Sequence, residues 1–200
     1  MEFLFPLLVL VAIFHVVKIR DQRRRILLLG GYLQQYQIEK LMETLLEGYL
    51  RALGEKDDER RQSIWRMLEE AETRLSDQLK QLAQDFSKIW GDHVLVSTLP
   101  IALPLADKLA PQATFDMRRA LQLHADGIAQ VVANEAGRSE RDKAFMLTAE
   151  ILLLQHTCHW FCRSKTVASA RMVARHRTHY EQLLDAVSPT TREAYRRLFR

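Results

Sequence analysis

Residues 57–90 read DDERRQSIWRMLEEAETRLSDQLKQLAQDFSKIW and form the longest regular pattern in the chain. Asp57 and Asp58 place negative charge at the positive end of a helix dipole. Apolar positions then recur at steps of three and four residues: Ile64, Leu68, Ala71, Leu75, Leu79, Leu82, Phe86 and Ile89. This spacing, with one stutter, predicts one long coiled-coil-like helix of roughly 50 Å. We expect it to pack within an intrachain bundle; the alternative is a seam between two copies.

Composition extends this interpretation to the rest of the chain. The 200 residues include only 7 Gly and 5 Pro, and Leu, Ala, Arg, Gln and Glu predominate. These residues favour helices, and no segment shows convincing strand alternation. We therefore predict an all-α protein with one helical bundle domain over residues 26–200.

Further helices are predicted on both sides of the long one. Gly30 and Gly31 suggest a break after the first helix, and residues 32–53 form an amphipathic pattern that ends at Gly54. Ser139 begins a capping-box pattern, and no Gly or Pro follows it until Pro189. This gap predicts one very long helix or two helices stacked end to end. A short helix should then occupy residues 190–199.

The stretch from Val94 to Ala106 contains no charged residue, and Pro100 and Pro104 interrupt it. It is too short to cross a membrane, and prolines disfavour a regular buried helix. We expect a buried connector of helix fragments; the alternative is a segment that touches a membrane interface. Pro111 should lie early in the helix that follows.

The N-terminal nineteen residues read MEFLFPLLVLVAIFHVVKI, and none from Phe3 to Val17 carries a full charge. Five basic residues follow closely: Lys18, Arg20, Arg23, Arg24 and Arg25. This order predicts an N-terminal transmembrane helix with a basic flank over residues 1–25. The run is near the lower length limit of about 17 residues for a span.

The same flank predicts orientation, because Lys and Arg concentrate on the cytoplasmic side. We predict a single-pass protein of the cell (inner) membrane, with its N-terminus outside and the bulk of the chain cytoplasmic. A cleaved signal peptide is disfavoured, because Glu2 precedes the apolar run and bulky Val16 and Val17 close it.

The C-terminal region of residues 163–200 carries nine Lys or Arg and three Asp or Glu, which gives a formal charge of +6. The predicted basic docking surface consists of Arg163, Lys165, Arg171, Arg175, Arg177, Arg192, Arg196, Arg197 and Arg200. Beside a membrane, this charge favours contact with anionic lipids, and an acidic protein would suit it as well. A solvated basic face is the simpler alternative. Nucleic acid is disfavoured, because no recognised binding motif accompanies the charge.

One cluster resembles a set of metal ligands. His156, Cys158, His159 and Cys162 lie within seven residues, so several can share a helix face. A structural zinc site takes four ligands, usually from two segments, and the second segment is missing. The cluster is a weak metal candidate, and buried free cysteines and core histidines are the commoner explanation. Both cysteines should be reduced in the cytoplasm.

No motif for a phosphate loop, a metalloprotease or a nucleophile elbow occurs in the chain. We therefore assign no catalytic or cofactor-binding residue, expect no cofactor, and disfavour an enzyme. The sequence favours a membrane-anchored scaffold, assembly or regulatory subunit that contacts a protein partner or forms a homo-oligomer. The alternatives are a membrane-linked signal-transducing coiled-coil module and, less favoured, a metal- or thiol-dependent enzyme.

Overall fold

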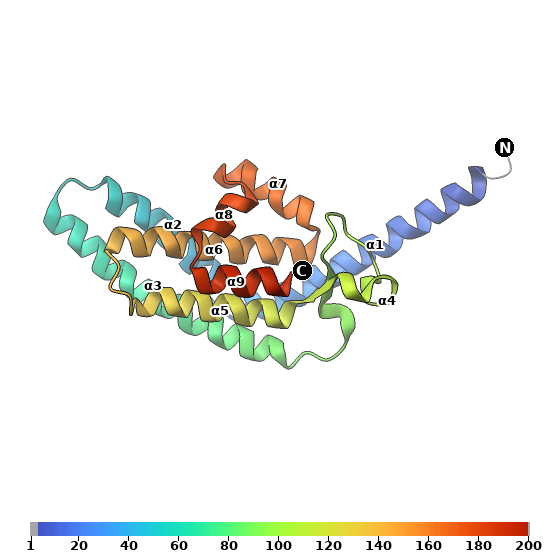
Figure 1. Cartoon of the computed structure of the whole chain (residues 1–200), viewed down its shortest axis with the longest axis horizontal. Coiled ribbons are helices and arrows are strands. Elements are labelled where there is room, and N and C mark those ends of the chain that lie inside the picture. The colour runs from blue at the N-terminus through green and yellow to red at the C-terminus, as the bar shows by residue number, and fades with distance from the viewer. Residues whose placement is uncertain (1–3, 200) are drawn as a thin grey trace.

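Helices account for most of the chain in the computed structural model, which describes residues 4–199 (Figure 1). The α-helices are α1 (Leu4–Leu33), α2 (Ile38–Gly54), α3 (Asp58–Ser87), α4 (Ala106–Leu109), α5 (Met117–Ala133), α6 (Glu140–Cys162), α7 (Lys165–His176), α8 (Tyr180–Ala186) and α9 (Pro189–Leu198). The short elements are the 3₁₀ turns η1 (Asp92–Val94) and η2 (Pro111–Ala113) and the strands β1 (Leu95–Ser97) and β2 (Thr114–Asp116). The predicted all-α helical bundle is confirmed.

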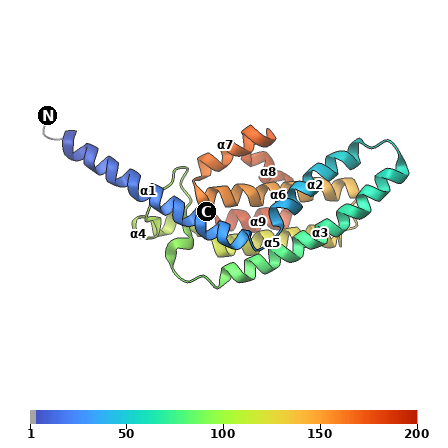
Figure 2. The same ribbon diagram turned by 180° about the vertical axis from the view of Figure 1, so that it is seen from behind.

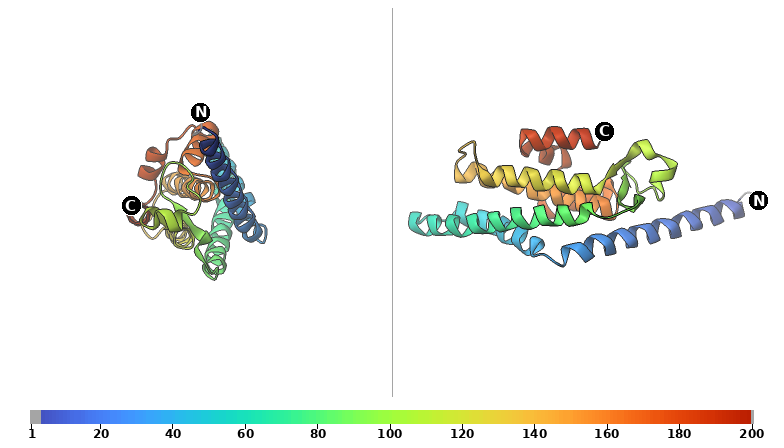
Figure 3. Two further views of the ribbon diagram at one scale, coloured as in Figure 1. Left: turned by 90° about the vertical axis from the view of Figure 1, so that its right-hand side faces the viewer. Right: turned by 90° about the horizontal axis from the view of Figure 1, so that it is seen from below.

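Helix α6 lies at the centre of the bundle and contacts α1, α2, α5, α7 and α8 (Figures 1 and 3). Its side chains are buried on several sides, as the consecutive residues Ile151, Leu152, Leu153 and Leu154 show. A helix that is apolar nearly all round must be surrounded by other elements. Burial of these side chains therefore places α6 in the interior.

The predicted long helix is present as α3. Its apolar positions Leu68, Leu75, Leu79, Leu82 and Phe86 are almost fully buried, and α3 packs against α2 and α5 of the same chain. Those residues serve an intrachain interface, as the heptad-like pattern predicted.

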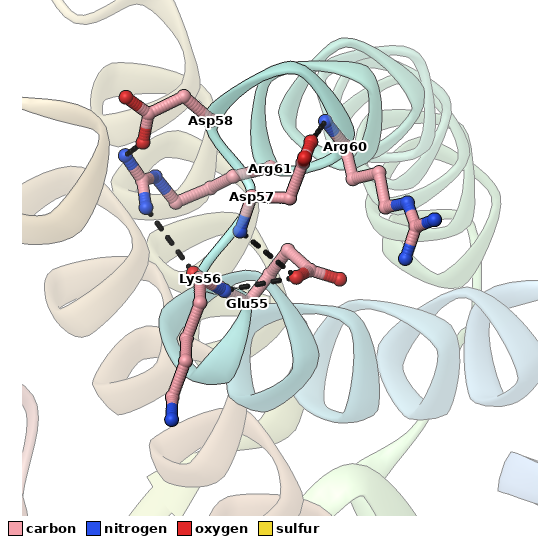
Figure 4. A network of polar contacts seen from close by, with 6 residues as sticks. All are labelled: Glu55, Lys56, Asp57, Asp58, Arg60 and Arg61. Atoms are coloured by element: carbon pink, nitrogen blue, oxygen red, sulfur yellow. Dashed lines mark hydrogen bonds and ion pairs between the residues drawn. The ribbon is translucent and has the colours of Figure 1, made fainter.

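A polar turn reverses the chain between α2 and α3 (Figure 4). Glu55 Oε1 accepts hydrogen bonds from the backbone N–H groups of Lys56 (2.8 Å) and Asp57 (3.1 Å). Asp57 caps α3 by accepting a bond from Arg60 N (2.9 Å), and Arg61 pairs with Asp58. The turn satisfies backbone donors that would otherwise be unpaired at the start of a helix. It therefore sets α2 and α3 side by side.

Three predicted boundaries are wrong. Helix α1 continues through Gly30 and Gly31 to Leu33, because glycine in a helix costs only about 1 kcal/mol. The segment after Ser139, predicted as one very long helix or two stacked end to end, forms three helices, α6, α7 and α8; the hydroxyl of Ser164 accepts a bond from Val167 N (3.3 Å) and begins α7. Pro111 lies in the turn η2, separated from α5 by a strand.

The sequence also gave no sign of the strand pair. β1 and β2 pair antiparallel, with Leu95 opposite Asp116, Val96 opposite Phe115, and Ser97 opposite Thr114. Strands of three residues are too short to display alternation. The pair closes a loop of residues 98–113. Ala106 and part of the predicted connector, which runs from Val94 to Ala106, are buried.

Helix α1 divides into two halves with different surroundings. Its C-terminal half packs on the bundle through Gln22, Arg25 and Leu29, which are buried. Its N-terminal half projects from one end of the molecule (Figures 1 and 2). Residues 5–16 of this half are all exposed.

The predicted transmembrane span is not supported by the structure. Among residues 4–199, no helix offers an apolar stretch long enough to cross a membrane. The uncharged stretch from Leu4 to Val17 measures about 21 Å, against roughly 30 Å for a hydrocarbon core. Lys18, Arg20 and Asp21 then follow within the same helix. Residues 1–3 of the predicted anchor lie outside the described part.

Candidate functional site

A half-open groove of about 1000 Å³ lies between α2, α6 and the C-terminal end of α7. On α2, Leu46, Leu50 and Leu53 form a second apolar stripe besides the one buried in the core, and Leu50 and Leu53 are 74% and 51% exposed. On α6, Phe145 is 68% exposed beside buried Leu152. Large apolar side chains thus remain open to solvent along two neighbouring helices.

The walls of the groove carry opposite charges. The α2 wall holds three exposed glutamates spaced by four residues, together with one lysine: Glu39, Glu43, Glu47 and Lys40. The facing charges are Arg141 in the first turn of α6 and Arg175 in the last turn of α7. A ligand that fills the groove would therefore meet a mainly acidic wall on one side and basic groups on the other.

Two histidines lie where α6 meets the end of α7. Both His159 and His176 line the groove. Burial lowers the pKa of His159, and Arg171 and Arg175 lower it further. Burial and Arg175 also lower the pKa of His176. Both rings are neutral at pH 7, so the basic side of the groove depends on its arginines.

The predicted basic docking surface is divided among several environments. Lys165 lies over the rings of Trp160 (5.2 Å) and Tyr180 (4.7 Å), and Arg163 Nη1 donates to Gln22 Oε1 (3.2 Å). On α9, Arg192 and Arg196 approach Asp185, and Arg197 pairs with Glu193 (3.1 Å). Arg171 and Arg175 are exposed on α7, Arg177 ends that helix in a left-handed conformation, and Arg200 lies outside the described residues. Among the described members of this set, Arg175 alone lines the large groove.

The predicted membrane-flanking residues also differ from one another. Arg20, Arg23 and Arg24 are exposed, and Lys18 is half-buried. Arg25 instead is 5% exposed: it pairs with Asp21 (2.9 Å), and its Nη2 donates to Leu95 O (3.3 Å). Arg25 therefore joins α1 to the strand pair.

The four metal candidates are not gathered into a site. Among residues 4–199, no three His, Cys, Asp or Glu side chains lie together as a metal ion would require. His156 Nε2 lies 3.0 Å from Ser169 Oγ, and His159 faces the groove. Burial raises the pKa of the Cys158 thiol well above its usual range and that of Cys162 to about 11. Both thiols are protonated at neutral pH, which makes them poor nucleophiles.

A buried polar seam on the other side of α6 was not predicted from the sequence. It consists of His124, Glu150, Thr157, Ser188, Thr191 and Tyr195. Thr157 Oγ1 donates to Leu153 O (3.0 Å) and lies 2.9 Å from His124 Nε2 and 3.1 Å from the Tyr195 hydroxyl. Because Thr157 donates its only hydroxyl proton to Leu153 O, its oxygen accepts hydrogen bonds from His124 Nε2 and from the Tyr195 hydroxyl.

The second half of the polar seam surrounds Glu150. Its Oε1 accepts a bond from Ser188 N (3.0 Å), and Ser188 Oγ lies 3.0 Å from Thr191 Oγ1. A Cβ atom on Gly127 would clash with Thr191 Oγ1 and lie 3.1 Å from Glu150 Oε2. The absence of a side chain at Gly127 therefore lets α5 approach α6 and α9. The available sequence signal was a glutamate and a histidine at otherwise apolar positions.

Comparison with known protein families, curated proteins and solved structures gave no match for this chain.

Proposed function

We propose that this protein is a membrane-attached adaptor whose groove binds an amphipathic helix of a partner protein. The observation that carries the proposal is the open groove between α2, α6 and α7, with its apolar lining and oppositely charged walls. Amphipathic helices bind such grooves through apolar residues at positions i, i+3 or i+4, and i+7. The partner's chemistry follows from these features.

The partner helix should carry one apolar stripe with a basic flank and an acidic flank. The apolar stripe would cover Leu50, Leu53 and Phe145, which a monomer leaves in water. Its basic flank would face Glu39 and Glu43 on α2. Its acidic flank would face the arginines of α6 and α7. Charge complementarity of this kind fixes orientation and speeds association.

Attachment to the membrane is proposed through the N-terminal half of α1. Large apolar side chains are exposed along its whole length; they are Phe5, Leu7, Leu8, Val9, Leu10, Val11, Ile13, Phe14 and Val16. Because they point in all directions around the helix, a groove on a protein would cover only one side of them. A bilayer covers every side, and Arg20, Arg23 and Arg24 would then lie near anionic headgroups.

The groove is tested by photo-crosslinking in cells that naturally make the protein. A photoreactive amino acid replaces Leu53, which is 51% exposed in the groove, or Met67, which is 55% exposed on α3 outside it. We expect the Leu53 variant alone to crosslink a partner segment, which mass spectrometry would identify. The proposal requires that segment to be an amphipathic helix with one basic and one acidic flank.

Other crosslinking outcomes contradict the proposal. The same adducts from both positions would show that the groove is not selective. No adduct from Leu53, or one to an extended or uniformly charged segment, would remove the helix-binding role. An adduct to a second copy of this chain would replace the adaptor with a homo-oligomer.

A further inference from the structure

The loop of residues 98–113 leaves and re-enters the bundle at one fixed point. β1 and β2 close its base, and Thr98 N extends their ladder by donating to Ala113 O (2.8 Å). Neighbouring helices also hold it: Trp160 Nε1 donates to Ser97 O (3.0 Å), and Thr166 donates to Pro100 O through both its backbone N (3.0 Å) and its Oγ1 (2.8 Å). These hydrogen bonds therefore hold the loop in a defined position on the bundle.

The outer side of this loop is apolar. Ile101 and Leu109 are 64% and 66% exposed, and Leu99 and Leu105 are exposed as well. Pro104 and Ala106, near the middle of the loop, are buried on either side of exposed Leu105, so the loop has an inner side that packs and an outer side that does not. The outer side leaves apolar side chains without a covering surface.

Leu105 has a backbone conformation that is unusual for its side chain. Its φ of 56° and ψ of 34° lie in the left-handed region. Glycine and asparagine adopt this conformation readily, whereas a bulky residue is strained in it. Its carbonyl oxygen accepts bonds from Lys108 N (3.0 Å) and Leu109 N (2.9 Å) and so begins α4. The geometry of this turn does not require a leucine at position 105, and the Leu105 side chain is 49% exposed instead of being packed in the core.

The loop lies beside α1 at the end of the bundle from which α1 projects. Figures 1 and 3 show the loop and α4 at the end of the bundle from which α1 projects. Burial raises the pKa of Asp21 and lowers that of Arg25, and Asp107 of α4 is close enough to α1 to act on both groups as a smaller upward influence. A bilayer that receives the apolar half of α1 would therefore approach the outer side of the loop.

We propose that this loop is a second membrane contact, which places Ile101, Leu105 and Leu109 in the lipid interface beside α1. The inference rests on the proposed attachment through α1. Exposed Lys108 and the exposed arginines Arg23 and Arg24 would add attraction to anionic headgroups. Two contacts instead of one would fix the tilt of the bundle and hold its groove at a set orientation to the membrane.

The test uses the full chain with one polarity-sensitive fluorophore on an introduced cysteine at Ile101, Leu109, Leu10 or Met67. The native Cys158 and Cys162 are partly buried thiols of raised pKa and react slowly. The protein is mixed with vesicles of phosphatidylcholine and phosphatidylglycerol that contain spin-labelled lipids. We expect a blue shift and quenching at Leu10, Ile101 and Leu109, with the two loop labels quenched best by spin labels near the headgroups. Met67 should show neither.

The four labels separate failure of the loop from failure of the attachment. If Leu10 enters the lipid and both loop labels behave like Met67, the loop contact is overturned and the attachment survives. If no label enters the lipid, both proposals fail. Entry of the loop labels alone would retain the loop contact and overturn attachment through α1. A loop signal that needs no lipid and grows with protein concentration would identify a second copy and overturn the membrane contact.

Discussion

The two sides of α6 reverse the usual distribution of polarity. Toward α5 and α9, the helix buries Glu150 and Thr157 in the polar seam, where hydrogen bonds fix their neighbours. Toward α2 and α7, it leaves Phe145 in solvent on the edge of the groove. Buried polar groups must find partners within the chain, and exposed apolar groups can find them outside it. Changes in the first region should therefore alter stability, and changes in the second should alter binding.

Acid should produce the largest change in stability. Burial lowers the pKa of His124 to about 3 and that of His156 to about 4, from about 6.5 in an unfolded chain. Between the folded and the unfolded pKa values, the unfolded chain binds more protons than the folded chain. The contribution of the two neutral histidines to the free energy of unfolding is therefore fully present above pH 6.5 and is lost as the pH falls. Each histidine contributes about 1.4 kcal/mol per pH unit. Urea unfolding at several pH values from neutral to mildly acidic measures this slope.

Protonation of Glu150 has the opposite effect on stability at acidic pH from protonation of the buried histidines. Burial raises its pKa although Ser188 and Thr191 donate to it, so the folded chain binds that proton first and offsets part of the loss. Replacement of Glu150 by Gln should make the acid slope steeper, and His124→Gln should make it shallower. If both variants keep the slope of the unaltered protein, the buried groups do not control its acid stability.

Gly127→Ala should cause the next largest loss, about 2 kcal/mol of unfolding free energy. The new methyl group would push against Thr191 Oγ1 and crowd Glu150, and overpacking of a buried site costs about 1–3 kcal/mol. Gly31→Ala is the matched control, because a Cβ there meets nothing within 4 Å and a helical alanine should stabilise slightly. In a double-mutant cycle with Thr191→Ala, the two losses should be less than additive. Strict additivity would show that Gly127 and Thr191 are not in conflict.

Tyr49→Phe should cost about 1–2 kcal/mol, because its hydroxyl donates to buried Glu72 Oε1 (2.6 Å). Lys143 lies 2.5 Å from the other oxygen of Glu72, so the carboxylate keeps one partner. Tyr36→Phe is the control: the Tyr36 hydroxyl donates to Asp85 (2.7 Å) at the surface, and its loss should cost less. Equal losses in urea unfolding would show that burial does not strengthen the Tyr49 bond.

The sequence predicted elements whose pattern lies within one segment. The heptad-like positions of α3 and the capping pattern at Ser139 are visible in a few neighbouring residues, and the structure confirms them. The position of the break at Ser164 was not predicted, because a capping serine also occurs within helices.

The candidate sites depend on contacts between distant segments. The apolar stripe of Leu46, Leu50 and Leu53 marks a groove only because α6 and α7 lie beside α2. The sequence predicts Arg25 as part of the membrane flank, whereas the structure buries it against the strand pair, a contact that leaves no sign in the local sequence. Likewise, the His–Cys cluster suggested metal ligands because sequence spacing does not show which way each side chain points.

Phe145→Ala should have the smallest effect on stability, within about 0.5 kcal/mol, because the side chain is largely exposed and supports no other group. In the same protein, crosslinking from Leu53 to the partner should fall about fivefold or more, since loss of an aromatic anchor residue costs more than about 1 kcal/mol of binding. Met67→Ala is the control, because it removes a side chain of similar exposure outside the groove. A large loss of stability in Phe145→Ala would assign this side chain to the core. Unchanged stability with unchanged crosslinking would mean that the apolar side of α6 takes no part in binding, leaving the contrast between its two faces without a functional meaning.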